Sequence, residues 1–221
     1  MRSKKTDKEA ALAAKRHAAR AAIEHIRHDC RLGVGTGSTT NEFIALLPDV
    51  RDRITAVASS SQATTDLLSD LGFEVSPLSQ CGTLDLYVDG ADETDDHRRL
   101  IKGGGAALTG EKILVASSRR FVCIVDEGKR VKLLGKFPLP VEVIPMARSA
   151  VARKLVEMRG QPQYRQGVIT DYGNEILDVH NLKILDPEEM ESEINQIPGV
   201  VTVGRKPSSS IASAVASGLP K

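Results

Sequence analysis

Short apolar runs alternate with helical patterns between Arg31 and Val125, and this alternation constrains the fold more than any other feature of the chain. The runs have the length and composition of buried strands. They are Arg31–Val34, Ile54–Ala58, Phe73–Val75, Leu84–Val88 and Phe121–Val125. Strands that alternate with helices are typical of a mostly parallel sheet. We therefore predict an α/β domain with a Rossmann-like sheet and helices on both of its faces.

The pattern changes from Pro138 onward, to strand, helix, hairpin, helix and strand. This order predicts a smaller α+β domain of the ferredoxin-like kind. We place the larger domain at 1–136 and the smaller one at 137–204. The elements that we expect are a helix over Ala147–Met158 ended by Gly160, a hairpin that pairs Gly167–Thr170 with Glu175–Val179, a helix capped by Asp186, and a strand over Gly199–Val203.

Composition excludes several classes of protein. Thirty Lys and Arg against 29 Asp and Glu leave a net charge of +1, so no overall field attracts nucleic acid or a membrane surface. The basic residues near the N-terminus alternate with apolar ones at helical spacing, which indicates a solvated helix face. The start has no apolar signal-peptide core and no run of apolar residues is long enough to span a membrane, so we expect a cytoplasmic protein.

The segment Gly33–Ser38 follows the first predicted strand and leads into a helix. It matches neither the dinucleotide-binding glycine pattern nor a Walker A loop, which needs a lysine. Thr39 and Glu42 have the spacing of a capping box. Backbone N–H groups and hydroxyls at a helix N-terminus suit a phosphate, although a bare glycine turn explains the same residues equally well.

Asp89 and Asp92 come directly after an apolar strand, where open α/β sheets bind their ligands. We expect Lys102 to supply a cation near these carboxylates. The following acidic residues, Glu93, Asp95 and Asp96, are interpreted as solvated side chains of a turn.

Three consecutive glycines follow Lys102, and such a string indicates that something approaches the backbone closely. The alternative, a flexible linker, fits poorly with the apolar residues on either side. Glu111 falls early in the next helix, where a lone glutamate is usually only a favourable partner of the helix dipole.

Metal and nucleophile chemistry have little support. The five histidines form no pair with ligand spacing, and the cysteines, Cys30, Cys81 and Cys123, are too scattered for a zinc ribbon or a disulfide framework. No Gly-x-Ser-x-Gly elbow is present. We expect no metal and no organic cofactor.

Taken in this order, together with Lys129 and the segments 134–145 and 198–204, the motifs resemble ribose-5-phosphate isomerase of the A type. The resemblance runs from about Leu32 to Gly204. It implies an enzyme that interconverts D-ribose 5-phosphate and D-ribulose 5-phosphate in the pentose phosphate pathway without metal or cofactor. It also implies a homodimer, or in some members a tetramer.

The resemblance also implies the site. It makes Glu111 the proton acceptor, with Asp89 and Lys102 assisting at the substrate oxygens. Moving a proton between C1 and C2 of an aldose needs a base and a donor to the enediolate oxygen, and these residue types suit those tasks. Which carboxylate opens the sugar ring stays open. The implied substrate-binding positions are Thr36, Gly37, Ser38, Thr39, Asp89, Gly90, Ala91, Asp92, Lys102, Gly103, Gly104, Gly105 and Lys129.

Two alternatives remain at this point. A sugar-phosphate-sensing module would keep the phosphate loop but has no need for Glu111 and Lys102 together. Another enzyme on the same scaffold, such as an amino-sugar phosphate isomerase or a coenzyme A transferase, is the weaker alternative.

The tail departs from the family pattern after Gly204, where members continue through 205–221 into a strand of the larger domain. Here Pro207 and a serine run disfavour a strand, and Ile211–Ala216 offers little apolar bulk. We expect a frayed or repacked closing segment.

Overall fold

The computed structural model describes residues 2–206 and 216–217 and divides into two compact units. Among the described residues, unit 1 comprises 2–90, 113–130 and 216–217, and unit 2 comprises 91–112 and 131–206. Residues 91–112 and 131–136, which we placed in the larger predicted domain, thus belong to unit 2. The boundary at Lys136 stays a prediction.

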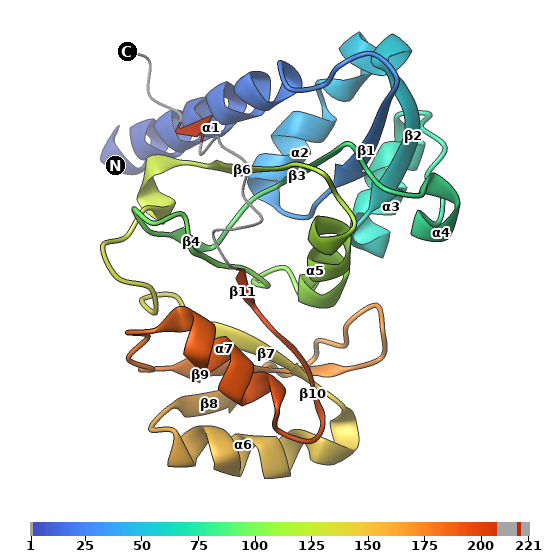
Figure 1. The fold of residues 1–221 in the computed structure, drawn as a ribbon. Coiled ribbons are helices and arrows are strands. Elements are labelled where there is room, and N and C mark those ends of the chain that lie inside the picture. Colours follow the sequence, from blue (N-terminus) through green and yellow to red (C-terminus); the bar gives the residue numbers. More distant parts are fainter. Residues whose placement is uncertain (1, 207–215, 218–221) are drawn as a thin grey trace. The chain divides into compact units, whose positions relative to one another are not determined.

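Unit 1 is built on a parallel sheet of five strands in the order β12-β6-β3-β1-β2 (Figure 1). Its strands are β1 (Cys30–Val34), β2 (Ile54–Ser59), β3 (Leu86–Asp89), β6 (Phe121–Val125) and β12 (Ala216–Ser217). Its helical segments are α1 (Arg2–Ile23), α2 (Ser38–Ile44), η1 (Leu47–Arg53), α3 (Gln62–Asp70), α4 (Leu78–Cys81) and η2 (Glu127–Lys129). The predicted Rossmann-like parallel sheet is confirmed.

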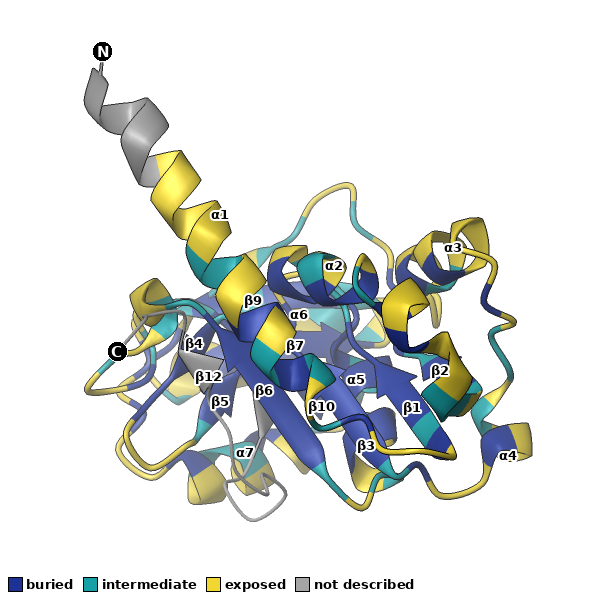
Figure 2. Ribbon diagram, turned by 90° about the horizontal axis from the view of Figure 1, so that it is seen from above, coloured by how far each residue is buried: buried dark blue, intermediate teal, exposed yellow. Residues whose placement is uncertain are grey.

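Alternate residues of β3 face opposite sides of this sheet, as the period of a strand requires. Leu86 and Val88 join the apolar core beneath α1 and α2, where the strands are buried (Figure 2). On the other face Tyr87 stacks on Phe121, with ring centroids 5.3 Å apart. Leu114 of α5 (Leu108–Ala116) packs on that second face, so helices cover both sides.

Two local predictions in unit 1 are wrong. Phe73–Val75 is no regular strand but makes a single bridge, Val75 to Val57, and Pro77 follows at once with no N–H to extend the pairing. Thr39 does not cap α2, because the helix begins at Ser38 and Gly37 is the N-cap.

Unit 2 contains an antiparallel sheet in the order β10-β7-β9-β8. Its elements are β7 (Leu139–Val143), η3 (Pro145–Ala147), α6 (Arg148–Glu157), β8 (Gln161–Tyr164), β9 (Glu175–His180), α7 (Pro187–Asn195) and β10 (Val200–Val203). The β-α-β-β-α-β order with this strand arrangement is the predicted ferredoxin-like α+β unit. A second sheet of three short antiparallel strands consists of β4 (Glu93–Thr94), β5 (Leu100–Ile101) and β11 (Arg205–Lys206).

The turn of the predicted hairpin is confirmed, but the first of its two predicted strands is wrong. Thr170 N–H donates to the Asn174 carbonyl at 2.9 Å, which closes the expected turn. The strand that pairs with β9 is Gln161–Tyr164, whereas Gly167–Thr170 is irregular. Pro162 lies within this strand, and β8 is an edge strand, where a missing N–H is tolerated.

The helix ends of unit 2 give one correction and one confirmation. Arg159, with φ at +65°, adopts the left-handed conformation after α6, and Gly160 only follows it. A Cβ on Gly160 would lie 2.6 Å from the Val179 side chain, so this glycine is needed for close packing. Asp186 caps α7 as predicted, accepting from the N–H groups of Glu188 and Glu189.

The tail is described only in part. Arg205–Lys206 pairs with β5, and Ala216–Ser217 pairs with β6 as a short parallel strand. Pro207, the serine run and 211–215 lie outside the described residues. A strand at Ala216 was not expected, and the prediction for the remainder stays a prediction.

Candidate active site

Unit 1 places three of the predicted segments at one edge of its sheet. Thr36–Thr39 follows β1, Asp89 ends β3, and Lys129 lies in η2 just after β6. These strands are parallel neighbours, so their carboxyl ends meet at the same edge. This is the edge where parallel α/β sheets bind ligands.

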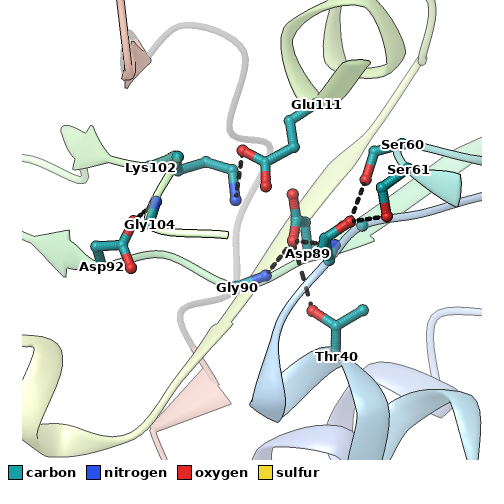
Figure 3. Close-up of polar contacts among 12 residues, drawn as sticks. Thr40, Ser60, Ser61, Asp89, Gly90, Asp92, Lys102, Gly104 and Glu111 are labelled. Carbon is teal, nitrogen blue, oxygen red and sulfur yellow. Dashed lines mark hydrogen bonds and ion pairs between the residues drawn. The ribbon is translucent and has the colours of Figure 1, made fainter. Parts of the chain in front are cut away.

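Asp89 is fully buried and held by short-range donors (Figure 3). Its Oδ1 accepts from the N–H of Gly90 at 2.7 Å and of Thr36 at 3.1 Å, and Oδ2 accepts from the Tyr87 hydroxyl. A Cβ on Gly35 would lie 1.9 Å from Cγ of Asp89. Gly35 is therefore required to make room for this carboxylate, a reason that the sequence did not reveal.

The hydroxyl of Thr36 faces a cluster of other hydroxyls. Its Oγ1 lies 2.9 Å from Ser60 Oγ, 2.7 Å from Ser61 Oγ and 3.1 Å from Thr64 Oγ1. Thr64 also donates to the Gly35 carbonyl at 2.8 Å. The sequence analysis missed these partners. A run of three serines stands at the carboxyl end of β2, and the same position at a strand end was the reason for predicting Asp89.

Lys15 was also missed. Its Nζ donates to Ser38 Oγ at 2.8 Å, and the neighbouring Arg16 forms an ion pair with Glu42 of α2 at 3.0 Å. The basic face of α1 thus partly contacts α2 and is not wholly solvated. A lysine beside this loop places a positive charge where an anion would bind.

Unit 2 contains two of the residues that the sequence predicted for acid/base chemistry, Lys102 and Glu111. Lys102 follows β5 and Glu111 lies in the first turn of α5, and both are 2% exposed. Lys102 Nζ lies 3.3 Å from Glu111 Oε2 (Figure 3). Two opposite charges at this distance in a buried site attract each other, and removal of either one would leave the other buried without its partner charge. The sequence predicted both residues but did not predict that they pair.

The glycine loop that joins them has a fixed backbone. Gly103 has φ at +104°, and a Cβ there would press on Leu108 and Pro140 at 3.0–3.3 Å. Gly104 donates its N–H to Asp92 Oδ2 at 2.8 Å (Figure 3). The loop is therefore an ordered turn, as the apolar flanks indicated, and not a linker.

The neighbouring carboxylates correct one interpretation. Glu93 is 3% exposed and accepts from the N–H groups of Gly135 and Phe137, and Asp95 is 5% exposed and accepts from Arg99. Both are structural anchors within unit 2. Only Asp96 is exposed as expected.

Two further features were sought in the described residues and not found: a metal-binding cluster and a membrane-spanning helix. Its His, Cys, Asp and Glu side chains form no group of three or more that could hold a metal ion. None of the helices in residues 2–206 has the length and apolar character needed to cross a membrane.

Comparisons with known proteins agree over most of the chain. Residues 55–215 match the family model of ribose 5-phosphate isomerase A (phosphoriboisomerase A). A curated protein of Stenotrophomonas maltophilia named ribose-5-phosphate isomerase A is 58% identical over 192 residues, which are 86% of this chain and 89% of that protein.

Solved structures give the same result. Ribose 5-phosphate isomerase A from Neisseria gonorrhoeae has a TM-score of 0.89 at 45% identity, with 93% of this chain and 92% of that chain covered. A D-ribose-5-phosphate isomerase in complex with phospho-erythronic acid has a TM-score of 0.83 at 40% identity, with 86% and 88% covered. These matches favour the isomerase over a sensing module. The chain belongs to the ribose 5-phosphate isomerase A family, and its activity is the interconversion of D-ribose 5-phosphate and D-ribulose 5-phosphate.

Proposed function

We propose that Glu111 is the base that carries the proton between C2 and C1 of the substrate. Its carboxylate takes the C2 proton of the open-chain aldose, the C–H electrons form the C1=C2 double bond, and the C1 carbonyl electrons move to O1. Glu111 then returns the proton to C1, while the hydroxyl proton moves from O2 to O1. The observation that supports this role is the buried Glu111–Lys102 pair.

Lys102 has the complementary role in this proposal. Its ammonium stabilises the negative charge that develops on the enediolate oxygen. A buried cation that is already in place costs little reorganisation when that charge forms. The glycine loop, Gly103–Gly105, together with Ala91 and Asp92, contributes backbone and carboxylate contacts to the sugar hydroxyls.

Asp89 and the loop after β1 have the remaining roles. We assign ring opening and the O2-to-O1 proton shuttle to Asp89. Thr36–Thr39, Gly90 and Lys129 bind the substrate, and we add Lys15 to the phosphate end because it contacts Ser38. The binding of phospho-erythronic acid by a relative of known structure supports an anion-binding role for the matching residues here.

Glu111→Gln tests the base directly, because it removes the carboxylate without removing bulk. We expect the turnover of ribose 5-phosphate to fall by about 10²- to 10⁴-fold with little change in KM. The matched control is Glu157→Gln, which changes an exposed glutamate paired with Lys154 on α6. A Glu111→Gln enzyme that keeps more than about a tenth of wild-type turnover would not be using Glu111 as its base.

These steps use only side chains of this chain, so dialysis against a chelator should leave turnover unchanged. Loss of turnover that a divalent ion restores would contradict the proposed mechanism. We further propose a cytoplasmic homodimer, on the strength of the family resemblance. Size-exclusion chromatography with light scattering measures the mass in solution, and the mass of a monomer would refute the dimer.

A further inference from the structure

Arg165 holds the carbonyl side of the glycine loop. It follows β8 directly, and its N–H donates to the Ile176 carbonyl at 3.0 Å, so its backbone extends the β8–β9 ladder. The side chain then reaches the loop. Nη1 donates to the carbonyl oxygens of Gly103 at 3.0 Å and Gly104 at 3.2 Å.

The guanidinium is itself fixed by an acidic partner on β9. Nε donates to Asp178 Oδ2 at 2.8 Å and Nη2 donates to Oδ1, which is a two-pronged pair. The Arg165 side chain is 16% exposed and that of Asp178 is 18% exposed. A planar guanidinium that is held along one edge presents its remaining donors in a fixed direction.

The turn supplies one hydrogen bond of its own, from the Ala106 N–H to the Gly103 carbonyl at 3.0 Å. Its three glycines have no side chains, and glycine has the largest backbone freedom of any residue. The other contacts that order it come from outside the loop: the Gly204 carbonyl accepts the Lys102 N–H at 2.7 Å, Asp92 accepts the Gly104 N–H, and Arg165 binds the Gly103 and Gly104 carbonyls. Among these three partners of the loop, Arg165 is the one that carries a positive charge.

Peptide planarity carries the effect of Arg165 to the opposite side of the loop. The Gly104 carbonyl and the Gly105 N–H belong to one trans peptide unit, so a fixed carbonyl sets the direction of that N–H. The Gly103 carbonyl is coupled to the Gly104 N–H in the same way. Fixing both oxygens therefore fixes two donors and the path of the chain from Lys102 towards α5.

We propose that Arg165 is a positioning residue for the isomerase reaction, which orients the Gly103–Gly105 backbone through its two carbonyls. The proposal rests on the substrate-binding role assigned above to this loop. The simpler interpretation, an ion pair that only joins β8 to β9, predicts a change in stability and none in catalysis.

Arg148 provides a matched control for that interpretation. It also pairs with a carboxylate of β9, since Nη1 lies 3.0 Å and 3.1 Å from the two oxygens of Glu175. Its guanidinium packs over the Tyr164 ring at 4.3 Å. Arg148→Ala thus removes an arginine–carboxylate pair from the same sheet and leaves the bonds from Arg165 to the loop intact.

The experiment compares wild type, Arg165→Ala, Arg165→Lys and Arg148→Ala in two measurements. Ribose 5-phosphate kinetics give kcat and KM, and hydrogen exchange with mass spectrometry reports on the amides of 103–107. We expect Arg165→Ala to lower kcat/KM by about 10- to 100-fold, as the loss of charge-assisted hydrogen bonds predicts, and to speed exchange in the loop. Arg165→Lys should recover only part, because one ammonium cannot replace the fork.

Added guanidinium ion at millimolar concentration should restore part of the activity of Arg165→Ala and leave Arg148→Ala unchanged. If Arg165→Ala does not fold, Asp178→Asn tests the same contact, because it keeps Arg165 and removes the charge that fixes it. Loop exchange and kinetics in Arg165→Ala that match those of Arg148→Ala would overturn the proposal.

The two measurements separate this proposal from the assignment of the loop. Faster loop exchange with unchanged kcat/KM would show that Arg165 orders the loop but that the loop does not serve the substrate, which overturns the positioning role and the loop's assignment. The base assigned to Glu111 is tested by its own variant and is unaffected by that result.

Discussion

Gly35 and Gly37 lie in the same loop but are required for different physical reasons, so their alanine variants should differ sharply. A Cβ on Gly35 would lie 1.9 Å from Cγ and 2.1 Å from Oδ1 of Asp89. A Cβ on Gly37 would meet nothing within 4 Å, but Gly37 has φ at +131°. Gly35→Ala is therefore a collision, and Gly37→Ala is a backbone strain.

The structure sets the two magnitudes. The Asp89 carboxylate must move in Gly35→Ala, and its hydrogen bonds from Gly90 N–H and Thr36 N–H then weaken or break. Each bond to a charged group contributes about 1.5–3 kcal/mol, so we expect a loss of about 3–6 kcal/mol in the free energy of unfolding. Gly37→Ala should cost about 1–3 kcal/mol, because its φ of +131° with ψ of 170° is a backbone conformation that essentially only glycine adopts.

Urea unfolding of both variants measures these costs, and ribose 5-phosphate turnover measures the consequence for Asp89. A double-mutant cycle with Asp89→Gly isolates the collision. Gly35→Ala should be much less costly in that background, because the atoms it meets are gone. Equal losses for Gly35→Ala and Gly37→Ala, or an additive cycle, would refute the reasoning.

Three further predictions concern buried or paired side chains. Hydrogen bonding from Arg31 lowers the pKa of Asp85, so the ionised carboxylate stabilises the fold above about pH 4, and this stabilisation is lost as pH falls through the lowered pKa. Urea unfolding should therefore show a lower free energy of unfolding for Asp85→Asn than for wild type above about pH 4, and this difference should disappear in stronger acid. Burial, with the nearby charge of Asp85, raises the pKa of the Cys30 thiol to about 11, so native protein should resist alkylation at pH 8 and react only in urea. Glu142 accepts from Thr170 and Asn174 within unit 2, so Glu142→Gln should lower the free energy of unfolding by about 1–3 kcal/mol, and an unchanged urea midpoint would contradict this.

Local sequence patterns were sufficient for much of the secondary structure. Strand period and apolar composition located Phe121–Val125 with its bounds as observed, and the cap at Asp186 followed from residue type alone. They failed where a partner decided the outcome: Gln161–Tyr164 is a strand because β9 pairs with it, although Pro162 disfavours one.

The candidate site divides in the same way. The sequence by itself singled out Asp89, Lys102 and Glu111, because they stand in motifs whose residue types and order resemble those of the family, and their catalytic roles are a proposal. Only the tertiary structure decided what those residues contact. Lys15 reaches Ser38 across 23 positions, and Arg165 reaches Gly103 across 62. A local pattern reports backbone preference and the periodicity of burial, whereas such contacts depend on how separate segments pack, and the spacing of residues along the chain carries little information about that.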